Sequence, residues 1–501
     1  EQIPQEILNK LVIKNNDFVG RKIEIERLNT IKKSGNSGII VVYGRRMVGK
    51  TELIEQFFQN DVLLKFEGIQ TNQKSKIQSN LYQINNCLHR LAKYMDNLLY
   101  KKIMCKSWTD FFEILDPIIH KYKLVLYFDE IQWLANYRSE FLAELKPFWD
   151  DSWRHVSGFM LVFCGSSPSF IVNQLMGDKA LYARSQNEFH LKPFSAVEIK
   201  SFLKKVGNYE AMLAQLTVGG IPEYLKIIRE SNSVLSGICE NSYLPDSFFF
   251  NEAQRIFVSS LSNNKHYKQI IDYLSKRKYA TRKEIQSRFS IKSGGTLSTI
   301  LMDLENCGFI ERYVPLNLSD NSLLSRYMIS DEYLQFYYKY IKPQKSSIEN
   351  GKFINNPNAG LPISGFQINL GFCFERWCRK NCHLFARILG FDKIEYLSGA
   401  FFNRESESKY PGFQIDLIYI RADHKILICE IKYYQQEIDS KKVFTTALQK
   451  KNVFCKVVPK YKNYSYEYIL ITTEGIKNNK EQQDYFDHVI CFDDIFNVKY
   501  W

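Results

Sequence analysis

Residues 44–51 have the types and spacing of a loop that binds phosphate, G-x-x-x-x-G-K-T. Glycines at both ends of such a loop let backbone N–H groups wrap around phosphate oxygens, and the helix that follows adds its positive N-terminal end. Lys50 would bridge the β- and γ-phosphates of a nucleotide, and the Thr51 hydroxyl would hold Mg²⁺. The pattern therefore predicts ATP or ADP as a ligand. The cradle itself would consist of Gly44, Arg45, Arg46, Met47, Val48 and Gly49.

Residues 124–130 (LVLYFDE) place two acids at the end of an apolar run. Asp129 suits a contact with the magnesium ion of a bound nucleotide, and Glu130 suits the polarisation of an attacking water. The structural alternative is a solvated acid pair at the start of a loop. In a chain that also carries the phosphate-binding loop, the pair favours hydrolysis of the nucleotide.

Two further polar positions follow the apolar run at 160–164. Ser166 stands just beyond the end of that run, where a polar side chain can sense the γ-phosphate. Arg184 lies further along and can neutralise charge in the transition state. An ion pair at the protein surface explains Arg184 equally well, so both interpretations stay open.

The elements around these residues are those of an α/β protein. The runs at 37–43, 124–128 and 160–164 are apolar and rich in β-branched residues, as expected of buried parallel strands. Their alternation with helical segments predicts a doubly wound parallel sheet in an ATPase core at 1–193. From 194 to 262 the pattern is mainly helical, which predicts a helical lid.

Several segments, in the same order, make the chain resemble the archaeal-type ATPase family in the STAND branch of P-loop NTPases. The resemblance implies that Arg21 and Pro222 lie near the nucleotide base, and that ATP drives a switch rather than a fast motor. Arg45 departs from the family, which often has proline or another small residue there, although a backbone cradle does not require one. The segments are 18–21 (FVGR), 44–51, 129–130, 165–194 with Ser166, Arg184, Pro193 and Phe194, and 219–222 (GGIP).

Residues 263–340 have the element order of a winged helix-turn-helix, three helices with a turn and then a β-hairpin. Thr281 would be the N-cap of the second helix, and the third helix, at 296–306, would be the recognition helix. Its N-terminal end would meet base edges and phosphates of double-stranded DNA. A module for packing or protein contacts is the alternative. The residues available for DNA are Lys292, Ser293, Thr296 and Ser298 near the recognition helix, and Arg282, Lys283 and Arg288 on the second helix.

A second group of acids lies near the C-terminus. Glu430 and Lys432 are two residues apart on a predicted strand, so both face one side of a sheet. Asp416 lies on the strand before, and a symmetric hairpin centred on Asp423 places it opposite Glu430. Two facing carboxylates repel unless something positive lies between them, and a divalent cation together with Lys432 meets that need. Glu375, on the preceding helix, would complete the shell.

This D-x13-E-x-K pattern resembles the PD-(D/E)XK restriction-endonuclease-like fold, and in particular the C-terminal domain often fused to archaeal-type ATPases. By the resemblance, Asp416 and Glu430 hold Mg²⁺ or Mn²⁺, Lys432 positions the attacking water and Glu375 orients the site. The chain departs from the pattern in lacking a proline before Asp416. Two functions stay open: cleavage of DNA, or a catalytically inert nuclease fold in an ATP-regulated DNA-binding or scaffold protein.

The predicted architecture is thus α/β: a doubly wound P-loop core, a helical lid, a winged helix, and an α+β restriction-endonuclease-like domain at 366–501. Residues 341–365, rich in proline, glycine, asparagine and serine, are expected to be a linker. A length of 501 residues accommodates about three domains.

The composition narrows the setting. A formal charge of +13 favours polyanionic partners, and residues 265–315 carry ten Lys or Arg against five Asp or Glu. Eleven cysteines in no repeating frame indicate reduced thiols. No apolar run approaches the ~18 residues of a membrane helix, and the start has no signal-peptide pattern. We therefore expect a cytoplasmic protein, and whether it forms a homo-oligomer stays open.

Overall fold

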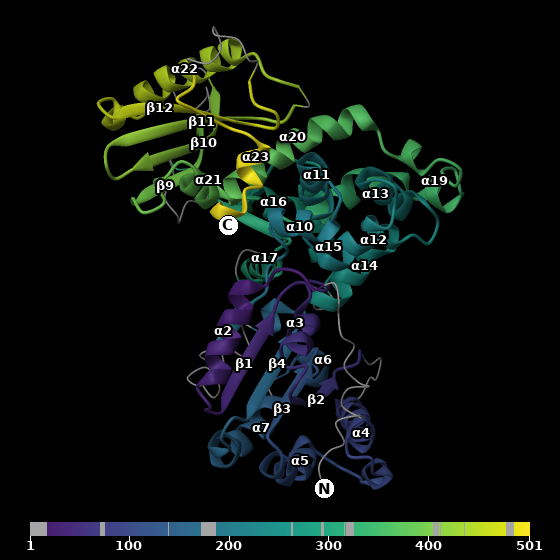
Figure 1. Ribbon diagram of the computed structural model, residues 1–501. Helices are drawn as coiled ribbons and strands as arrows, with labels where there is room; N and C mark the ends of the chain where they lie inside the picture. Colours follow the sequence, from purple (N-terminus) through teal and green to yellow (C-terminus); the bar gives the residue numbers. More distant parts are fainter. Residues whose placement is uncertain are drawn as a thin grey trace.

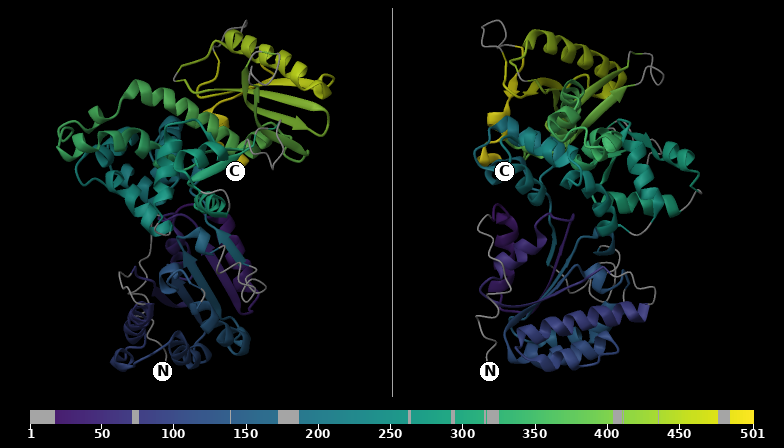
Figure 2. Two further views of the ribbon diagram at one scale, coloured as in Figure 1. Left: turned by 180° about the vertical axis from the view of Figure 1, so that it is seen from behind. Right: turned by 90° about the vertical axis from the view of Figure 1, so that its right-hand side faces the viewer.

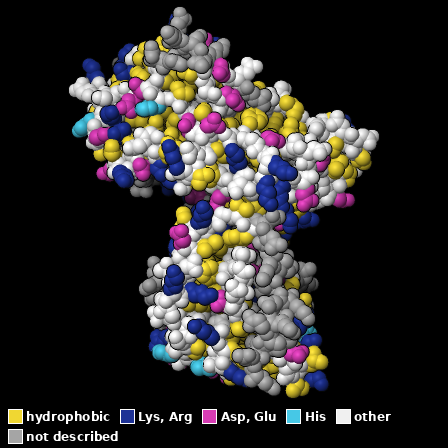
Figure 3. All heavy atoms as spheres, in the orientation of Figure 1, with side chains coloured by type: hydrophobic (Ala, Val, Ile, Leu, Met, Phe, Trp, Pro, Cys, Tyr) yellow, Lys and Arg dark blue, Asp and Glu magenta, His cyan; other side chains and the backbone are white. Residues whose placement is uncertain are grey.

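The computed structural model consists of two lobes joined by a narrower waist (Figures 1 and 3). The first holds the N-terminal sheet, and the second holds the lid helices and the C-terminal sheet (Figure 2). Arg184, Lys292 and Ser293 fall outside the residues that the structure describes. Those residues are 18–70, 76–138, 140–171, 187–261, 264–291, 295–314, 316, 325–403, 410, 412–434, 436–476 and 485–501.

The first lobe is built on a five-stranded parallel sheet in the order β2-β3-β4-β1-β5. The three apolar runs that predict buried strands form its centre, which confirms the predicted parallel α/β sheet. The outer strands β2 and β5 contain more polar residues and were not predicted. The strands are β1 (Gly38–Tyr43), β2 (Val62–Glu67), β3 (Leu124–Asp129), β4 (Met160–Gly165) and β5 (Asn187–His190).

Both faces of this sheet are covered by helices. Alternate residues of β1 serve different cores: Ile40 and Val42 join one hydrophobic cluster, and Ile39 and Val41 join the other. One face carries α2 (Lys22–Lys33) and α3 (Lys50–Phe57), and the other carries α4 (Lys76–Tyr94), α5 (Trp108–Lys121) and α7 (Glu140–Asp151).

The lid is helical, as predicted. Its close packing requires small residues, since a Cβ on Gly220 would come within 2.1 Å of the Phe194 carbonyl oxygen. A capping box between Ser195 and Glu198 starts the first lid helix. The lid helices are α10 (Ala196–Leu203), α11 (Asn208–Val218), α12 (Pro222–Arg229), α13 (Val234–Tyr243) and α14 (Phe248–Ser260).

Three helices and a β-hairpin follow the lid, in the order expected of a winged helix-turn-helix. Thr281 caps the second helix and forms a capping box with Glu284, as the sequence predicts for the N-cap. The elements are α15 (Lys265–Ser275), β6 (Ala280–Thr281), α16 (Arg282–Phe289), α17 (Gly295–Asn306), β7 (Ile310–Tyr313) and β8 (Arg326–Ile329).

The segment predicted as a linker, 341–365, is largely helical and packed. It contains η5 (Lys342–Gln344), α19 (Lys345–Glu349) and η6 (Pro357–Gly360). Ile348 and Phe353 are buried, and Phe353 packs against Tyr243 of α13 with ring centroids 5.8 Å apart. A few apolar residues among many polar ones are enough to fix this segment on the lid, which is why its composition alone suggests a linker.

The C-terminal part is a separate mixed sheet in the order β13-β12-β11-β10-β9. Strands β9, β10 and β11 pair antiparallel, and β11, β12 and β13 pair parallel. Its elements are α20 (Ile363–Lys380), α21 (Cys382–Ile388), β9 (Tyr396–Asn403), β10 (Phe413–Arg421), β11 (Lys425–Lys432), α22 (Ser440–Val457), β12 (Ser465–Thr472), β13 (His488–Ile490) and α23 (Phe492–Ile495).

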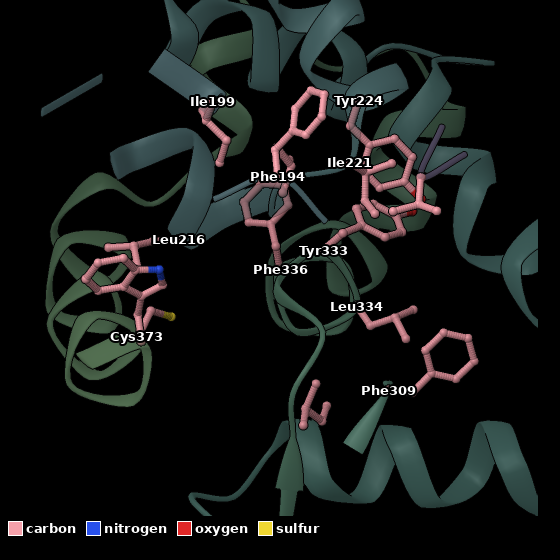
Figure 4. Close-up of a cluster of buried hydrophobic side chains, with 14 of the residues drawn as sticks. Phe194, Ile199, Leu216, Ile221, Tyr224, Phe309, Tyr333, Leu334, Phe336 and Cys373 are labelled. Carbon is pink, nitrogen blue, oxygen red and sulfur yellow. The ribbon is translucent and has the colours of Figure 1, made fainter. Parts of the chain in front are cut away.

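One hydrophobic cluster joins the lid to the segments that follow it. Phe194 and Tyr224 of the lid region, Tyr333 and Phe336 of α18 (Glu332–Phe336), and Cys373 of α20 belong to it (Figure 4). The lid therefore packs on the C-terminal part of the chain as well as on the sheet below it. All eleven cysteines are free thiols. No helix among the described residues is both long and apolar enough to cross a bilayer.

Candidate nucleotide site and a second acidic site

The predicted phosphate-binding loop joins β1 to α3 at one edge of the sheet. Gly44 has φ 153° and Gly49 has φ 92°, conformations that favour glycine. A Cβ on Gly44 would lie 2.4 Å from the Leu191 carbonyl oxygen, so a larger residue has no room there. Both glycines of the motif are thus required by the backbone, and the N-terminus of α3 points into the loop.

Lys50 and Thr51 are held in place by different partners. The Lys50 ammonium is buried and donates to the carbonyl oxygens of Gly44 at 3.2 Å and Arg45 at 3.0 Å. The Thr51 hydroxyl donates to the Asp129 carboxylate at 2.9 Å, and Lys65 of β2 pairs with the same carboxylate at 3.2 Å. A hydroxyl and a carboxylate oxygen side by side are a donor set that suits Mg²⁺, and the fold brings the two predicted residues together.

Glu130 has a left-handed backbone, φ 48°, at the end of β3. Its carboxylate accepts a hydrogen bond from the Ser166 hydroxyl at 2.6 Å and another from the Gln132 amide. The Gln132 amide also donates to the Ser166 hydroxyl at 3.1 Å. The predicted acid and the predicted γ-phosphate sensor thus form one network, and the fully buried Gln132, which the sequence analysis missed, holds it together.

A cavity of about 650 Å³ opens beside this network. The sheet and the phosphate-binding loop form one wall through Arg46, Glu67, Glu130 and Ser166. Helix α14 of the lid forms the other wall. The α14 residues along it are Asn251, Gln254, Arg255 and Val258.

The arginine side chains of the loop point away from the phosphate cradle and bind the second lobe. Arg45 pairs with Asp331 at 2.9 Å and donates to the Tyr224 hydroxyl at 3.1 Å. Arg46 pairs with Glu252 of α14 at 3.0 Å. Asp331 and Glu252 are buried, and burial raises the pKa of Asp331.

Arg21 and Pro222 flank the same loop. The Arg21 guanidinium donates to the backbone oxygen of Val48 at 2.7 Å and to that of Lys192 at 2.6 Å. The Pro222 ring lies 3.8 Å from where a Cβ on Gly49 would stand. Arg21 therefore fixes the backbone of the loop, and contact of either residue with a nucleotide base stays a prediction.

The C-terminal acids are brought together as the hairpin symmetry predicts. Leu417 of β10 pairs with Cys429 of β11, a register that places Asp416 opposite Glu430 at the next position. Asp416 is 6% exposed and Glu430 is fully buried. Their partial or complete removal from water makes the charge balance of this site decisive.

Lysines neutralise this second site directly. The Glu430 carboxylate accepts from Lys432 at 3.3 Å and from Lys450 of α22. Lys450 lies 20 residues beyond Glu430 and was not predicted. Burial and the charge of Asp416 raise the pKa of Glu375, on α20, to about 7. Burial also raises the pKa of Glu430.

The predicted metal-binding set is therefore assembled but not arranged as a metal shell. Within the described ranges, no group of three or more His, Cys, Asp or Glu side chains is placed to hold a metal ion. Asp416, Glu430 and Glu375 are oxygen donors of the kind Mg²⁺ and Mn²⁺ prefer. The physical obstacle is that two ammonium groups already occupy Glu430, so a cation would have to displace one of them.

A cavity of about 850 Å³ lies over this second site. Besides Glu375, Glu430 and Lys432, its walls include Tyr209 from lid helix α11 and the exposed Tyr434. Tyr209 also stacks on Tyr433 with ring centroids 5.9 Å apart. The lid thus contributes a wall to both cavities of the molecule described so far.

Comparisons with known proteins cover both parts of the chain. Residues 18–228 match the family model of an ATPase domain predominantly from Archaea. An uncharacterised protein of Methanocaldococcus jannaschii is 25% identical over 437 residues, which are 86% of this chain and 91% of that protein. An uncharacterised ATP-binding protein of the same organism is 46% identical over 43 residues, 9% of this chain and 73% of that protein.

Among solved structures, the Walker-type ATPase of Pyrococcus abyssi aligns with 65% of this chain and 97% of its own, at 18% identity and a TM-score of 0.49. The Aeropyrum pernix ORC2 protein, solved with ADPNP and ADP, aligns with 70% of this chain and 98% of its own, at 12% identity and a TM-score of 0.42. The family match and the geometry of the loop and its acids together support an archaeal-type P-loop ATPase domain in residues 18–228.

Proposed function

We propose that the chain is an ATP-hydrolysing switch whose nucleotide site controls the second lobe. In the hydrolysis step, Lys50 and the backbone of residues 44–49 bind the phosphates, and Glu130 orients the attacking water. Thr51 and Asp129 would hold Mg²⁺, which supplies positive charge at the β- and γ-phosphates when bound. The hydrogen-bonded network of Glu130, Gln132 and Ser166 keeps the acid aimed at the γ-phosphate position.

The observation that carries the switch is the pairing of the loop arginines with the second lobe. Arg45 binds Asp331, at the start of α18, and Arg46 binds Glu252, on α14. Phosphates that enter the cradle bring negative charge next to these guanidinium groups and change the backbone that carries them. Nucleotide binding thereby shifts the contacts of α14 and α18, which lead to the winged helix and to α20.

Hydrogen–deuterium exchange tests this coupling. With ATP present, we expect exchange of the backbone amides in α14 and α18 to change in the wild type. In Arg46→Met, which keeps the length of the side chain without its charge, ATP should still bind, but the change in α14 should be lost. Unchanged exchange in both helices upon saturation with ATP would exclude the switch and leave a simple ATPase.

DNA is the second ligand in this proposal. The helices α15–α17 and the hairpin have the winged-helix order, and the exposed basic residues of α16 include Arg282, Lys283 and Arg288. Lys278, between α15 and β6, lies 4.6 Å from the ring centroid of Phe372 on α20, and its charge lowers the pKa of Glu375 against the larger effect of burial. Duplex DNA on the basic segment would thus be adjacent to the C-terminal acids.

Cleavage of that DNA is the finer part of the proposal. Its support is the buried set of Asp416, Glu430 and Glu375 with Lys432, on the antiparallel hairpin predicted for a restriction-endonuclease-like domain. If Mg²⁺ or Mn²⁺ binds, these carboxylates would hold it and Lys432 would position the water. The competing function is that of a DNA-binding or scaffold protein, in which Lys432 and Lys450 keep the acids permanently neutralised.

A plasmid assay separates the two. Supercoiled DNA incubated with the wild type, ATP and Mn²⁺ should be nicked or linearised, and Asp416→Ala should leave it intact. Cleavage that persists in Asp416→Ala would point to a contaminating nuclease. Intact plasmid with the wild type under all combinations of ATP and Mn²⁺ would favour the inert fold.

A further inference from the structure

Helix α14 presents a charged face to the cavity beside the nucleotide site. Glu252, fully buried, lies on this face and binds Arg46 of the phosphate-binding loop. Arg255 is three residues further along and therefore shares the face. It lines the same cavity of about 650 Å³ as Glu130 and Ser166, from the opposite wall.

Arg255 differs from the other arginines of this site in having no partner. Arg21 is bound to backbone oxygens, Arg45 to Asp331 and Arg46 to Glu252. Arg255 is exposed to the cavity and makes no hydrogen bond or ion pair with any residue in the described parts of the chain. A guanidinium with this freedom can bind a ligand without first breaking an ion pair to a described residue.

The charges around the cavity call for a cation at this position. Glu67 and Glu130 line the sheet side, and Asp129 lies just behind them at the end of β3. A triphosphate in the cradle adds further negative charge between these acids and α14. Lys50 reaches the phosphates from the loop, but it leaves the α14 side of the γ-phosphate without a positive group.

We propose that Arg255 is a further catalytic residue of ATP hydrolysis, binding the γ-phosphate from the lid side. The inference rests on the proposed hydrolysis at Glu130. In that step the water oxygen bonds to the γ-phosphorus while the bond from this phosphorus to the bridging oxygen breaks. ADP keeps the bonding electron pair, and Glu130 accepts the proton of the water. Arg255 stabilises the charge on the γ-phosphoryl oxygens as this exchange occurs.

This position also gives the switch its direction. Arg255 carries a lid helix, α14, whose C-terminal end leads to α15 of the three-helix segment. A bound γ-phosphate holds α14 against the sheet through Arg255, and release of phosphate removes that contact. ATP and ADP therefore differ in the closure of the lid, although both bind the same loop.

Three variants test the role of Arg255: Arg255→Ala, Arg255→Lys and, as a matched control, Arg138→Ala. Arg138 is an exposed arginine of the ATPase core that does not line the cavity. The measurements are kcat, the Kd of a non-hydrolysable ATP analogue, and retention of ADP with aluminium fluoride, which imitates the transferring phosphoryl group. Circular dichroism and Tm establish that each variant is folded.

In Arg255→Ala we expect kcat to fall about 10²-fold, as on removal of one transition-state donor, with the Kd of the analogue changed less than about threefold. Retention of ADP with aluminium fluoride should be lost, and Arg255→Lys should recover part of it. Arg138→Ala should match the wild type in all three measurements.

Two results overturn the inference. One is wild-type kcat and wild-type retention of the fluoride complex in Arg255→Ala. The other is a loss of kcat in Arg255→Ala that the weaker binding of the ATP analogue explains entirely. A wild-type chain that binds ATP but never hydrolyses it, together with an equally inactive Glu130→Gln, contradicts the proposed hydrolysis first and removes the role of Arg255 with it.

Discussion

The nucleotide site and the C-terminal acidic site contain the same kinds of residue in opposite arrangements. At the nucleotide site, Lys50 is bound to two neutral carbonyl oxygens, so its charge is available to an incoming phosphate. At the C-terminal site, Lys432 and Lys450 are bound to the buried carboxylate of Glu430. The first arrangement is prepared for an anionic ligand, whereas the second is already neutralised from within.

This difference separates binding from stability. Removal of a charged group from the nucleotide site takes away a contact that exists only with the ligand. Removal of a charged group from the C-terminal site leaves buried partners uncompensated in the folded chain itself. Substitutions at the two sites should therefore report on different quantities.

The largest effect on stability is expected from Glu430→Ala. Two ammonium groups would lose their buried counter-charge, and the free energy of unfolding should fall by about 3–5 kcal/mol. Urea denaturation of the full chain, followed through the transition of its C-terminal part, measures this. Glu437→Ala, an exposed acid of the same cavity, is the control and should change stability by less than about 0.5 kcal/mol. Equal effects of the two substitutions would contradict the assigned role of Glu430.

Lys50→Ala should have its main effect on ligand binding. Charge-assisted hydrogen bonds contribute roughly 1.5–3 kcal/mol each, so the loss of contacts with the β- and γ-phosphates should raise the Kd for ATP by about 10²-fold or more. Isothermal titration calorimetry measures the Kd, and Lys33→Ala on the exposed end of α2 is the control. Tight ATP binding by Lys50→Ala would place the nucleotide elsewhere.

The C-terminal site should also respond to pH. Since the folded-state pKa of Glu375 is raised from 4.5 to about 7, the folded chain holds a proton that the unfolded chain releases. The stability that Glu375 contributes is present below its unfolded pKa and falls as the pH rises from about 4.5 to about 7, then levels off. Comparison of wild type with Glu375→Gln in urea across this range isolates the effect, and a difference that grows with pH would reverse the assignment.

A smaller effect is expected at the basic segment between the two sites. Lys292→Glu should weaken the binding of duplex DNA and reduce its salt dependence, because one phosphate contact is lost. Fluorescence anisotropy at several salt concentrations measures both. Binding that is unaffected by Lys292→Glu, and absent from residues 263–340 as a fragment, would make this segment a packing module.

Local patterns in the sequence were sufficient for part of this account. The apolar runs predicted β1, β3 and β4, because buried central strands carry few polar residues. Strand β2 contains Lys65 and β5 reads Asn-Glu-Phe-His, and neither has such a pattern. Hairpin symmetry predicted the facing of Asp416 and Glu430, since register follows from counting residues about a short turn.

The residues that complete each site could not be predicted in this way. Lys450 reaches Glu430 from a crossover helix, and Asp331 and Glu252 reach the loop arginines from more than 200 residues away. These contacts depend on how the lobes pack, which no local periodicity encodes. Gln132 was nearer at hand, since its spacing of two from Glu130 is visible in the sequence, but nothing there indicates that it would bridge to Ser166.

The central claim is that the acid at position 130 hydrolyses ATP held by residues 44–51. Its most direct test is the steady-state ATP hydrolysis rate of wild type and Glu130→Gln, with the Kd for ATP measured in parallel. We predict that Glu130→Gln binds ATP as the wild type does but loses most of its turnover, since an amide cannot polarise water as a carboxylate does. Equal turnover in the two proteins would contradict the account.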